Sequence, residues 1–413
     1  MMNCTFRTVN VSSMDSSRKN QSHFYLVAGI AIGFTIAYVT LAPSAVYEHN
    51  YDYYDHPKNV RFHESYQNEE NNPVNHGHEN EYEEFHREGD MDDVFGPKEE
   101  VGAHNDNDTF HKMTNTDLAD ALYKEVKILC WVMTGPENHE KKAKHVKATW
   151  GKRCNILLFM SSQEDKTLPA IALPVGEGRN NLWAKTKEAF KYVFQNYFDE
   201  ADWFMKADDD TYVIVENLRY MLLGIDTQKP IYFGARFKPF IKQGYMSGGA
   251  GYVLSKEALR KFVVEAIPNK AICRQDTGGS EDVEIGKCLA AVNVEAGDSR
   301  DPEHRGRFFA FSPLHHLIPG HVDNKFWYWK YIYYNESQGM DCCSDNAVSF
   351  HYMKPDMMYT MEYLLYHLRP FGIAYDPKLP PKLSGILKDG HSKEHKDNVS
   401  SEGQTQNRIV SQT

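Results

Sequence analysis

Short apolar runs alternate with amphipathic stretches along the chain from about residue 120. Apolar runs bounded by turn residues are typical of buried strands, and apolar positions three or four residues apart are typical of helices. The runs predicted as strands cover residues 127–133, 155–160, 202–207, 231–234 and 251–254. The stretches predicted as helices cover residues 137–149, 181–198, 215–223 and 256–266. Strands and helices alternating at this spacing predict an α/β fold with a largely parallel sheet.

One apolar run is too long for a strand. Residues 24–42 are nineteen residues without a charge, and as a helix they would span roughly 28 Å, close to the thickness of a bilayer core. Basic residues precede the run and acidic residues follow it, which places the N-terminus in the cytosol. A cleaved signal peptide is the alternative, but the run exceeds the usual length of about 7–15 residues. We therefore expect a cytosolic tail at residues 1–22 and a transmembrane signal-anchor helix at residues 23–45.

The charge of the chain is concentrated in one segment. The net charge is -11, and residues 48–100 carry sixteen acidic residues against four basic ones, so the remainder is close to neutral. This balance argues against nucleic acid as a partner, because nucleic-acid binders need a basic face. Residues 46–119 also contain few aliphatic side chains and are predicted to form an acidic flexible stem. A single folded domain is predicted at residues 120–385, followed by a disordered polar tail at residues 386–413.

The part of the chain after the predicted span has two marks of an oxidising lumen. It contains six cysteines, an even number that fits a disulfide framework. The predicted bonds, between cysteines close in the chain, are Cys130–Cys154 and Cys273–Cys288. Cys342 and Cys343 either bond to each other or pair separately. Sequons compatible with glycosylation lie at Asn107, Asn335 and Asn398.

Three adjacent carboxylates, Asp208, Asp209 and Asp210, follow the predicted strand at residues 202–207. Such groups repel one another unless a cation is present, and hard oxygen ligands suit Mg²⁺ or Mn²⁺. A strand followed by a DxD turn is the arrangement with which glycosyltransferases bridge a metal to a nucleotide diphosphate. A solvated acidic turn is the alternative. The apolar strand before the triplet, and Lys206 two residues upstream, favour a metal site for a nucleotide sugar.

Two further side chains are candidates for chemistry. His351 lies between aromatic residues and is either a packed core residue or a metal ligand beside carboxylates. Asp282 follows Ser280, a candidate N-cap, at a predicted helix start. Acidic residues are common in a first helical turn for dipole reasons. The functional alternative is a general base that deprotonates an acceptor hydroxyl.

The glycines at residues 248–251 do not form a dinucleotide-binding loop, because the G-x-G-x-x-G spacing is absent and a strand follows them. A tight turn or a close backbone approach explains them better. The aromatic segment around Trp327 is either core or a platform for a sugar ring.

Several longer motifs resemble the core 1 β1,3-galactosyltransferases of the β1,3-glycosyltransferase family 31, over about residues 120–380. The motifs are WVMT (131–134), WFMKADDDTY (203–212), PIYFG (230–234), YMSGGAGYVLS (245–255), VEAGDSR (294–300), FWYW (326–329) and CCSD (342–345). A related chaperone lacks the intact acidic triplet, and this chain keeps it.

The resemblance implies a GT-A fold and an inverting transfer of galactose from UDP-galactose to the 3-hydroxyl of GalNAc on Ser/Thr of glycoproteins. It implies Mn²⁺, with Mg²⁺ as an alternative, and a single-pass type II protein of the Golgi membrane whose catalytic domain is lumenal. A homodimer and a need for a chaperone stay open. The alternatives are a non-catalytic chaperone-like or binding paralogue, and a sister β1,3-glycosyltransferase with another donor or acceptor.

The resemblance also implies roles for individual residues. The metal ligands would be Asp208, Asp210 and His351, with Asp210 the principal carboxylate. The nucleotide sugar would be bound by Met133, Arg179, Lys206, Asp208, Asp209 and Tyr352. Asp282 would be the catalytic base. The acceptor sugar would lie near Gly249, Tyr252 and Trp327.

Overall fold

The computed structural model describes residues 97–102, 104 and 114–373. They belong to one compact unit, Asn80–Thr413. The predicted tail at 1–22, the span at 23–45, most of the stem and the tail at 386–413 lie outside the described residues, as do Asn107 and Asn398. Among the residues that the structure describes, no helix is both long and apolar enough to cross a membrane.

A seven-stranded sheet forms the centre of this unit, with the strand order β10-β6-β9-β4-β1-β2-β3. Its strands are β1 (Ile128–Met133), β2 (Ile156–Ser161), β3 (Ala170–Ala172), β4 (Trp203–Asp208), β6 (Ile231–Gly234), β9 (Tyr252–Ser255) and β10 (Glu295–Ala296). β9 runs antiparallel to both of its neighbours, and the other paired strands are parallel. The prediction of an α/β fold with a largely parallel sheet is confirmed.

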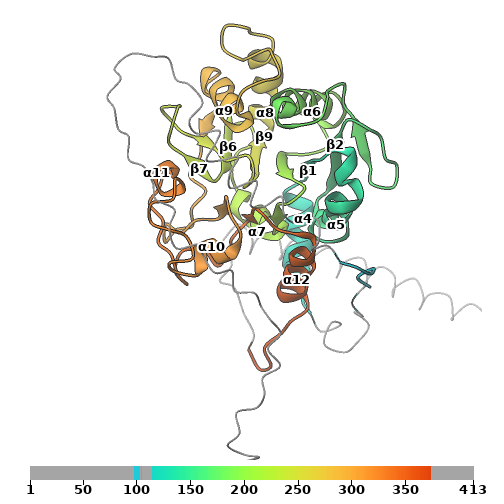
Figure 1. Cartoon of the computed structure of the whole chain (residues 1–413), viewed down its shortest axis with the longest axis vertical. Coiled ribbons are helices and arrows are strands. Elements are labelled where there is room, and N and C mark those ends of the chain that lie inside the picture. The colour runs from blue at the N-terminus through green and yellow to red at the C-terminus, as the bar shows by residue number, and fades with distance from the viewer. Residues whose placement is uncertain (1–96, 103, 105–113, 374–413) are drawn as a thin grey trace, which may run out of the picture. The chain divides into compact units, whose positions relative to one another are not determined.

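Helices cover both faces of this sheet (Figure 1). One face packs against α6 (Leu182–Tyr197), α8 (Lys256–Lys261) and α9 (Glu281–Ala291). The other face packs against α5 (Lys144–Ala148), α7 (Val215–Leu222) and α12 (Pro355–Tyr366), and α4 (Asp117–Glu125) contacts α7. Every side chain of β1 is buried, and its residues alternate between the two apolar clusters. A continuous apolar run is therefore what a strand between two helical layers requires.

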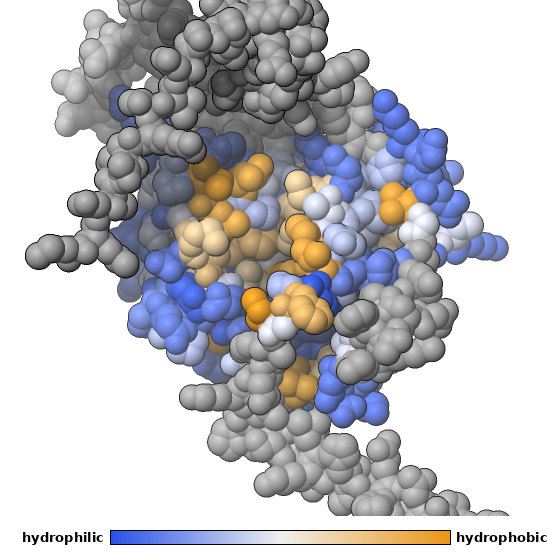
Figure 2. Space-filling view, turned by 90° about the horizontal axis from the view of Figure 1, so that it is seen from below, coloured by the Kyte–Doolittle hydropathy of each residue, from blue (hydrophilic) through white to orange (hydrophobic). Residues whose placement is uncertain are grey.

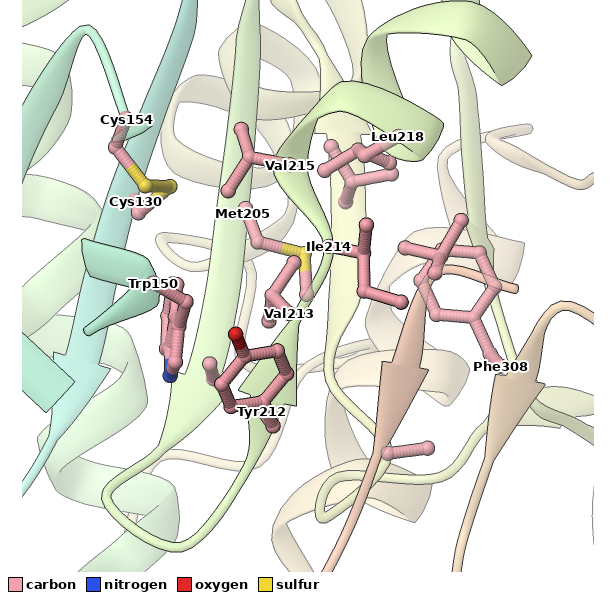
Figure 3. Packing of buried hydrophobic residues seen from close by; sticks show 14 of the residues in the cluster. Cys130, Trp150, Cys154, Met205, Tyr212, Val213, Ile214, Val215, Leu218 and Phe308 are labelled. Carbon is pink, nitrogen blue, oxygen red and sulfur yellow. A yellow bond between two sulfur atoms is a disulfide. The ribbon is translucent and has the colours of Figure 1, made fainter. Parts of the chain in front are cut away.

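The cluster on the α5 and α7 side is shown in Figure 3. Met205 of β4 packs there with Trp150 and Tyr212, next to the disulfide between Cys130 and Cys154. Both predicted disulfides, Cys130–Cys154 and Cys273–Cys288, are confirmed. Cys342 and Cys343 bond to each other, which decides between the two alternatives for that pair.

Short elements that the sequence pattern did not predict build a second layer beside the main sheet. A three-stranded sheet has the order β11-β12-β5, and β7 pairs with β8. Their bounds are β5 (Tyr212–Val213), β7 (Arg236–Phe237), β8 (Tyr245–Met246), β11 (Phe308–Phe309) and β12 (Ser349–Phe350). The short helices α10 (Pro313–Leu317) and α11 (Tyr328–Tyr331) lie between β11 and β12 in the chain. Two-residue strands have no periodicity, so pattern analysis could not find them.

The predicted helices differ from the observed ones in detail. Residues 137–149 contain three helical pieces, η1 (Pro136–Asn138), the π-helix η2 (His139–Ala143) and α5. α8 continues as the π-helix η5 (Phe262–Ala266), and single turns occur at η3 (Trp150–Arg153) and η4 (Arg179–Asn181). Ser280 occupies the N-cap position of α9, but its side chain makes no capping hydrogen bond.

The predicted stem is ordered close to the domain. α4 begins at Asp117, three residues before the predicted domain boundary at 120. The ring of His104, within the predicted stem, lies 4.2 Å from the ring of His367.

Figure 2 shows hydrophobic side chains gathered among hydrophilic ones on the face seen from below. Exposed apolar side chains of α12 include Tyr363 and Leu364.

Candidate active site

The acidic triplet lies at the carboxyl end of β4, in the middle of the main sheet. β1 runs parallel to β4, so Met133 lies beside Asp208 where both strands end. The turn is closed by a hydrogen bond from the Thr211 amide to the Asp208 carbonyl. Ligands of parallel α/β sheets bind beyond these strand ends.

Lys206 is the buried cation of this site, with only 2% of its side chain exposed. Its Nζ lies 2.6 Å from Asp208 Oδ1 and donates to the Gly248 carbonyl at 3.0 Å. Burial alone would lower the pKa of Lys206, but the carboxylates of Asp208 and Glu281 outweigh burial and raise it. Lys206 is therefore charged and fixed.

The structure brings the three predicted metal ligands together. Ligand atoms of Asp208, Asp210 and His351 all lie within 4.8 Å of one another. β12 pairs with β5, which directly follows the acidic triplet, and this pairing carries His351 to the end of β4. Two carboxylates and an imidazole fit a divalent cation such as Mn²⁺.

The ring of His351 is oriented by its surroundings. Its Nε2 lies 3.2 Å from Asp210 Oδ1, and its Nδ1 lies 3.2 Å from the Ala310 carbonyl. A proton on Nδ1 satisfies that carbonyl and leaves Nε2 as the ligand atom, which is the usual outer-shell arrangement of a metal-binding histidine. Tyr352, with a positive φ of 55°, holds its ring 4.0 Å from that of His351.

Gly248 and Gly249 lie between the predicted metal ligand His351 and the predicted base Asp282. A Cβ on Gly249 would lie 2.1 Å from Cε1 of His351, so no larger residue fits beside the ring. The Gly249 carbonyl accepts a hydrogen bond from Thr211 Oγ1 at 2.7 Å. Gly251 has a φ of 74°, in the region that favours glycine. The tight turn, one of the two alternatives for these glycines, is confirmed, and the close backbone approach to a ligand stays a prediction.

Asp282 lies on the other side of this turn, at the start of α9. Its Oδ2 accepts a hydrogen bond from the Gly248 amide at 3.3 Å, and its Oδ1 accepts one from the Val283 amide at 2.8 Å. Burial, and then repulsion from Glu281, raise the pKa of Asp282 to about 6. Asp282 as a whole residue is half-buried. A carboxylate with a pKa near neutrality suits a general base.

Tyr252 is buried beside Glu281. Its side chain is fully buried, and its hydroxyl donates to Glu281 Oε1 at 2.6 Å. Thr186 of α6 donates to the same oxygen at 2.8 Å. The side chain packs in the core and orients Glu281 beside the predicted base, and its place near the acceptor sugar stays a prediction.

A series of contacting aromatic rings connects the predicted metal ligand His351 with Trp327, the predicted contact for the acceptor sugar. Tyr352 stacks on Phe311 with ring centroids 5.7 Å apart, and Trp327 lies 6.0 Å from Phe311. Trp327 is half-buried and also packs on Phe237. Trp327 thus packs against the aromatic cluster, and its role as a platform for a sugar ring stays a prediction.

The acidic triplet has further neighbours that sequence analysis missed. Asp209 is 7% exposed and accepts a hydrogen bond from Thr134 Oγ1 at 2.8 Å. Burial raises the pKa of Asp209 to about 7, against the lowering effect of Lys142. Lys142 Nζ lies 3.5 Å from Asp210 Oδ2 and 3.9 Å from Asp209 Oδ1. No sequence signal distinguishes Lys142 from the other lysines of the same helical segment.

The predicted nucleotide-binding residues lie in segments that follow the carboxyl ends of the parallel strands. Met133 ends β1 beside Asp208, and Arg179 is exposed at the start of η4, in the connection that follows β3. The loop before Arg179 is tied to β1 through Lys185, which lies 2.7 Å from Glu177 and donates to the Thr134 carbonyl at 2.9 Å. In the sequence, Lys185 stands out only as a residue of the predicted helix at 181–198.

The chain is similar in sequence to known proteins. A protein-family model described as Fringe-like matches residues 123–301. The chain is 52% identical over 276 residues to glycoprotein-N-acetylgalactosamine 3-beta-galactosyltransferase 1 of Xenopus laevis, covering 67% of this chain and 75% of that protein. It therefore belongs to the glycoprotein-N-acetylgalactosamine 3-beta-galactosyltransferase family.

More distant proteins are similar over shorter stretches. A beta-1,3-glucosyltransferase of Mus musculus is 25% identical over 190 residues, covering 45% of this chain and 37% of that protein. A solved structure of a Drosophila galactosyltransferase mutant in complex with manganese, UDP-Gal and xylobiose is 14% identical, covers 41% of this chain and 64% of that chain, and has a TM-score of 0.26. A score this low supports no further comparison.

Proposed function

We propose that this chain has the GT-A fold and transfers galactose from UDP-galactose to the 3-hydroxyl of GalNAc O-linked to Ser/Thr of glycoproteins, with inversion at the anomeric carbon. The name of the Xenopus relative supports the donor sugar and the acceptor. The observation that supports the proposal is the turn at Gly248 and Gly249. His351, which lies beside Asp210, packs against Gly249, and Asp282 accepts a hydrogen bond from the Gly248 amide.

The donor would bind at the ends of β1 and β4. Asp208, Asp210 and His351 would hold Mn²⁺, whose charge offsets the charge that develops on the leaving diphosphate. Met133 lies beside Asp208, and Tyr352 packs on His351. Both would contact the nucleotide.

Asp282 would remove the proton from the 3-hydroxyl of GalNAc. The freed oxygen then attacks the anomeric carbon of galactose as the bond to UDP breaks, so the proton ends on Asp282 and the electron pair leaves with UDP. Hydrogen bonds from the amides of Gly248 and Val283 orient the carboxylate. The half-buried Trp327 would support the apolar face of the acceptor sugar.

We also propose that the enzyme is a single-pass type II protein of the Golgi membrane with a lumenal catalytic domain. The apolar run at residues 24–42 and the acidic residues after it support this topology. Three disulfides in the described domain fit an oxidising compartment. The homodimer and the chaperone requirement stay predictions of the resemblance.

An assay with a panel of UDP-sugars tests the proposal. Full-length protein in detergent should release UDP only with UDP-galactose, a GalNAc-bearing peptide and Mn²⁺, and the product should be a β1,3 linkage by NMR. Asp210→Ala should abolish turnover while the thermal unfolding profile persists. Consumption of a different UDP-sugar would indicate the sister transferase. Capture of a client polypeptide without any turnover would indicate the non-catalytic paralogue.

A further inference from the structure

Lys142 borders the acidic triplet on the side away from His351. Oδ1 of Asp210 faces Nε2 of His351 at 3.2 Å, and Oδ2 of the same carboxylate faces Nζ of Lys142 at 3.5 Å. The principal predicted metal ligand is thus flanked by an imidazole on one side and by an ammonium group on the other. Lys142 lies on η2, a π-helix in the connection that follows β1, and π-helical turns are frequent at functional sites.

The two lysines of the site differ in what they can still bind. Lys206 is nearly fully buried, and its ammonium group is fixed between Asp208 and the Gly248 carbonyl. Lys142 keeps 38% of its side chain exposed. Its distances to Asp210 and Asp209, 3.5 and 3.9 Å, are those of an ammonium group shared loosely between two carboxylates. Because an ammonium group has three donors, Lys142 retains capacity for a further anionic acceptor.

We propose that Lys142 binds the diphosphate of the sugar nucleotide beside the metal ion. The inference rests on the proposed function, because it assumes a nucleotide diphosphate at the ends of β1 and β4. A compact ammonium group is a common phosphate ligand, and charge-assisted hydrogen bonds are about twice as strong as neutral ones. Lys142 therefore contributes affinity for the phosphates and none for the uridine, and it supplies positive charge where the leaving group departs.

Calorimetry on the full-length enzyme in detergent tests this inference with UDP, uridine and Mn²⁺ as separate probes. Lys142→Met should weaken UDP binding at saturating Mn²⁺ by about tenfold or more, as expected for a lost charged contact. Binding of uridine should not change, and binding of Mn²⁺ alone should not weaken. Lys142→Arg should recover part of the UDP affinity. The matched control is Lys144→Met, because Lys144 lies two residues away and pairs with the exposed Glu140 at 2.8 Å.

The outcomes separate this inference from the proposed function. Unchanged UDP affinity in Lys142→Met, with metal-dependent UDP binding by the wild type, refutes the role of Lys142 and leaves the proposed function standing. An equal loss for uridine and UDP also refutes it, since Lys142 would then only shape the site. A wild-type enzyme that binds no UDP in Mn²⁺ overturns both.

Discussion

Gly249→Ala should disable the metal site while the fold persists. The added Cβ would lie 2.1 Å from Cε1 and 2.3 Å from Nδ1 of His351, so the ring must move. It has little room to do so, because its Nδ1 faces the Ala310 carbonyl at 3.2 Å and its face packs on Tyr352 at 4.0 Å. Displacing the ring breaks both contacts and withdraws Nε2 from Asp210.

The size of the effect follows from the cost of the clash. Overpacking a tight site by one methyl group costs about 1–3 kcal/mol. If relief of the clash requires the ring to leave its position, that cost appears in the metal affinity as a loss of about 5–150-fold. Loss of an outer-shell partner of a metal-binding histidine alone costs about 10–100-fold, which lies in the same range.

Electron spin resonance of Mn²⁺, titrated into the full-length protein, measures this affinity directly. Gly102→Ala is the matched control, since a Cβ at Gly102 meets nothing within 4 Å. His351→Ala should weaken Mn²⁺ binding, and adding Gly249→Ala to it should cost little more, because the two changes act on the same ligand. Wild-type Mn²⁺ affinity in Gly249→Ala would refute this account of the glycine.

Further predictions concern the base and the attachment of α12. Asp282→Asn should lower turnover by about 10²–10⁴-fold. In the wild type, kcat/KM should fall as the pH drops below about 6, because burial and repulsion from Glu281 raise the pKa of Asp282 to that value; a profile that stays flat well below pH 6 would contradict the base assignment. Glu362→Gln should cost about 3–5 kcal/mol in urea unfolding, because it leaves Arg153, 2.7 Å away, without its buried partner. Burial would raise the pKa of Glu362, but Arg153 and Lys152 lower it overall, so this stability is present at neutral pH and should be lost as the pH falls through the lowered pKa. Stability of Glu362→Gln equal to that of the wild type would count against this ion pair.

The sequence predicted the main sheet well because its central strands are buried on both faces. The runs at 127–133, 155–160 and 202–207 lie within one residue of the observed strands at every end. Their short length favours strands over helices. The pairing of Cys130 with Cys154 was also predictable, because the two residues are near in the chain and lie close to the ends of neighbouring predicted elements.

The site was predictable only where its parts are contiguous in the chain. Asp208 to Asp210 can be read locally, because charge repulsion and the preceding strand both point to a cation. His351 reaches them through β12 and β5, whose two-residue lengths have no period. The sequence alone therefore left His351 open between core residue and metal ligand, and the family resemblance favoured the ligand. Lys142 has no motif, and burial of Tyr252 depends on packing against α6 and α9, which a sequence pattern does not determine.

The contacts made by Gly248 bear on how acceptor choice could change in evolution. Its amide binds Asp282 and its carbonyl binds Lys206, so the link between the base and the donor side consists of main-chain atoms. Main-chain atoms persist through substitutions in neighbouring side chains. In the proposed mechanism, side chains of the loop at residues 276–280 could therefore change while the main-chain link between Asp282 and Lys206 stays in place.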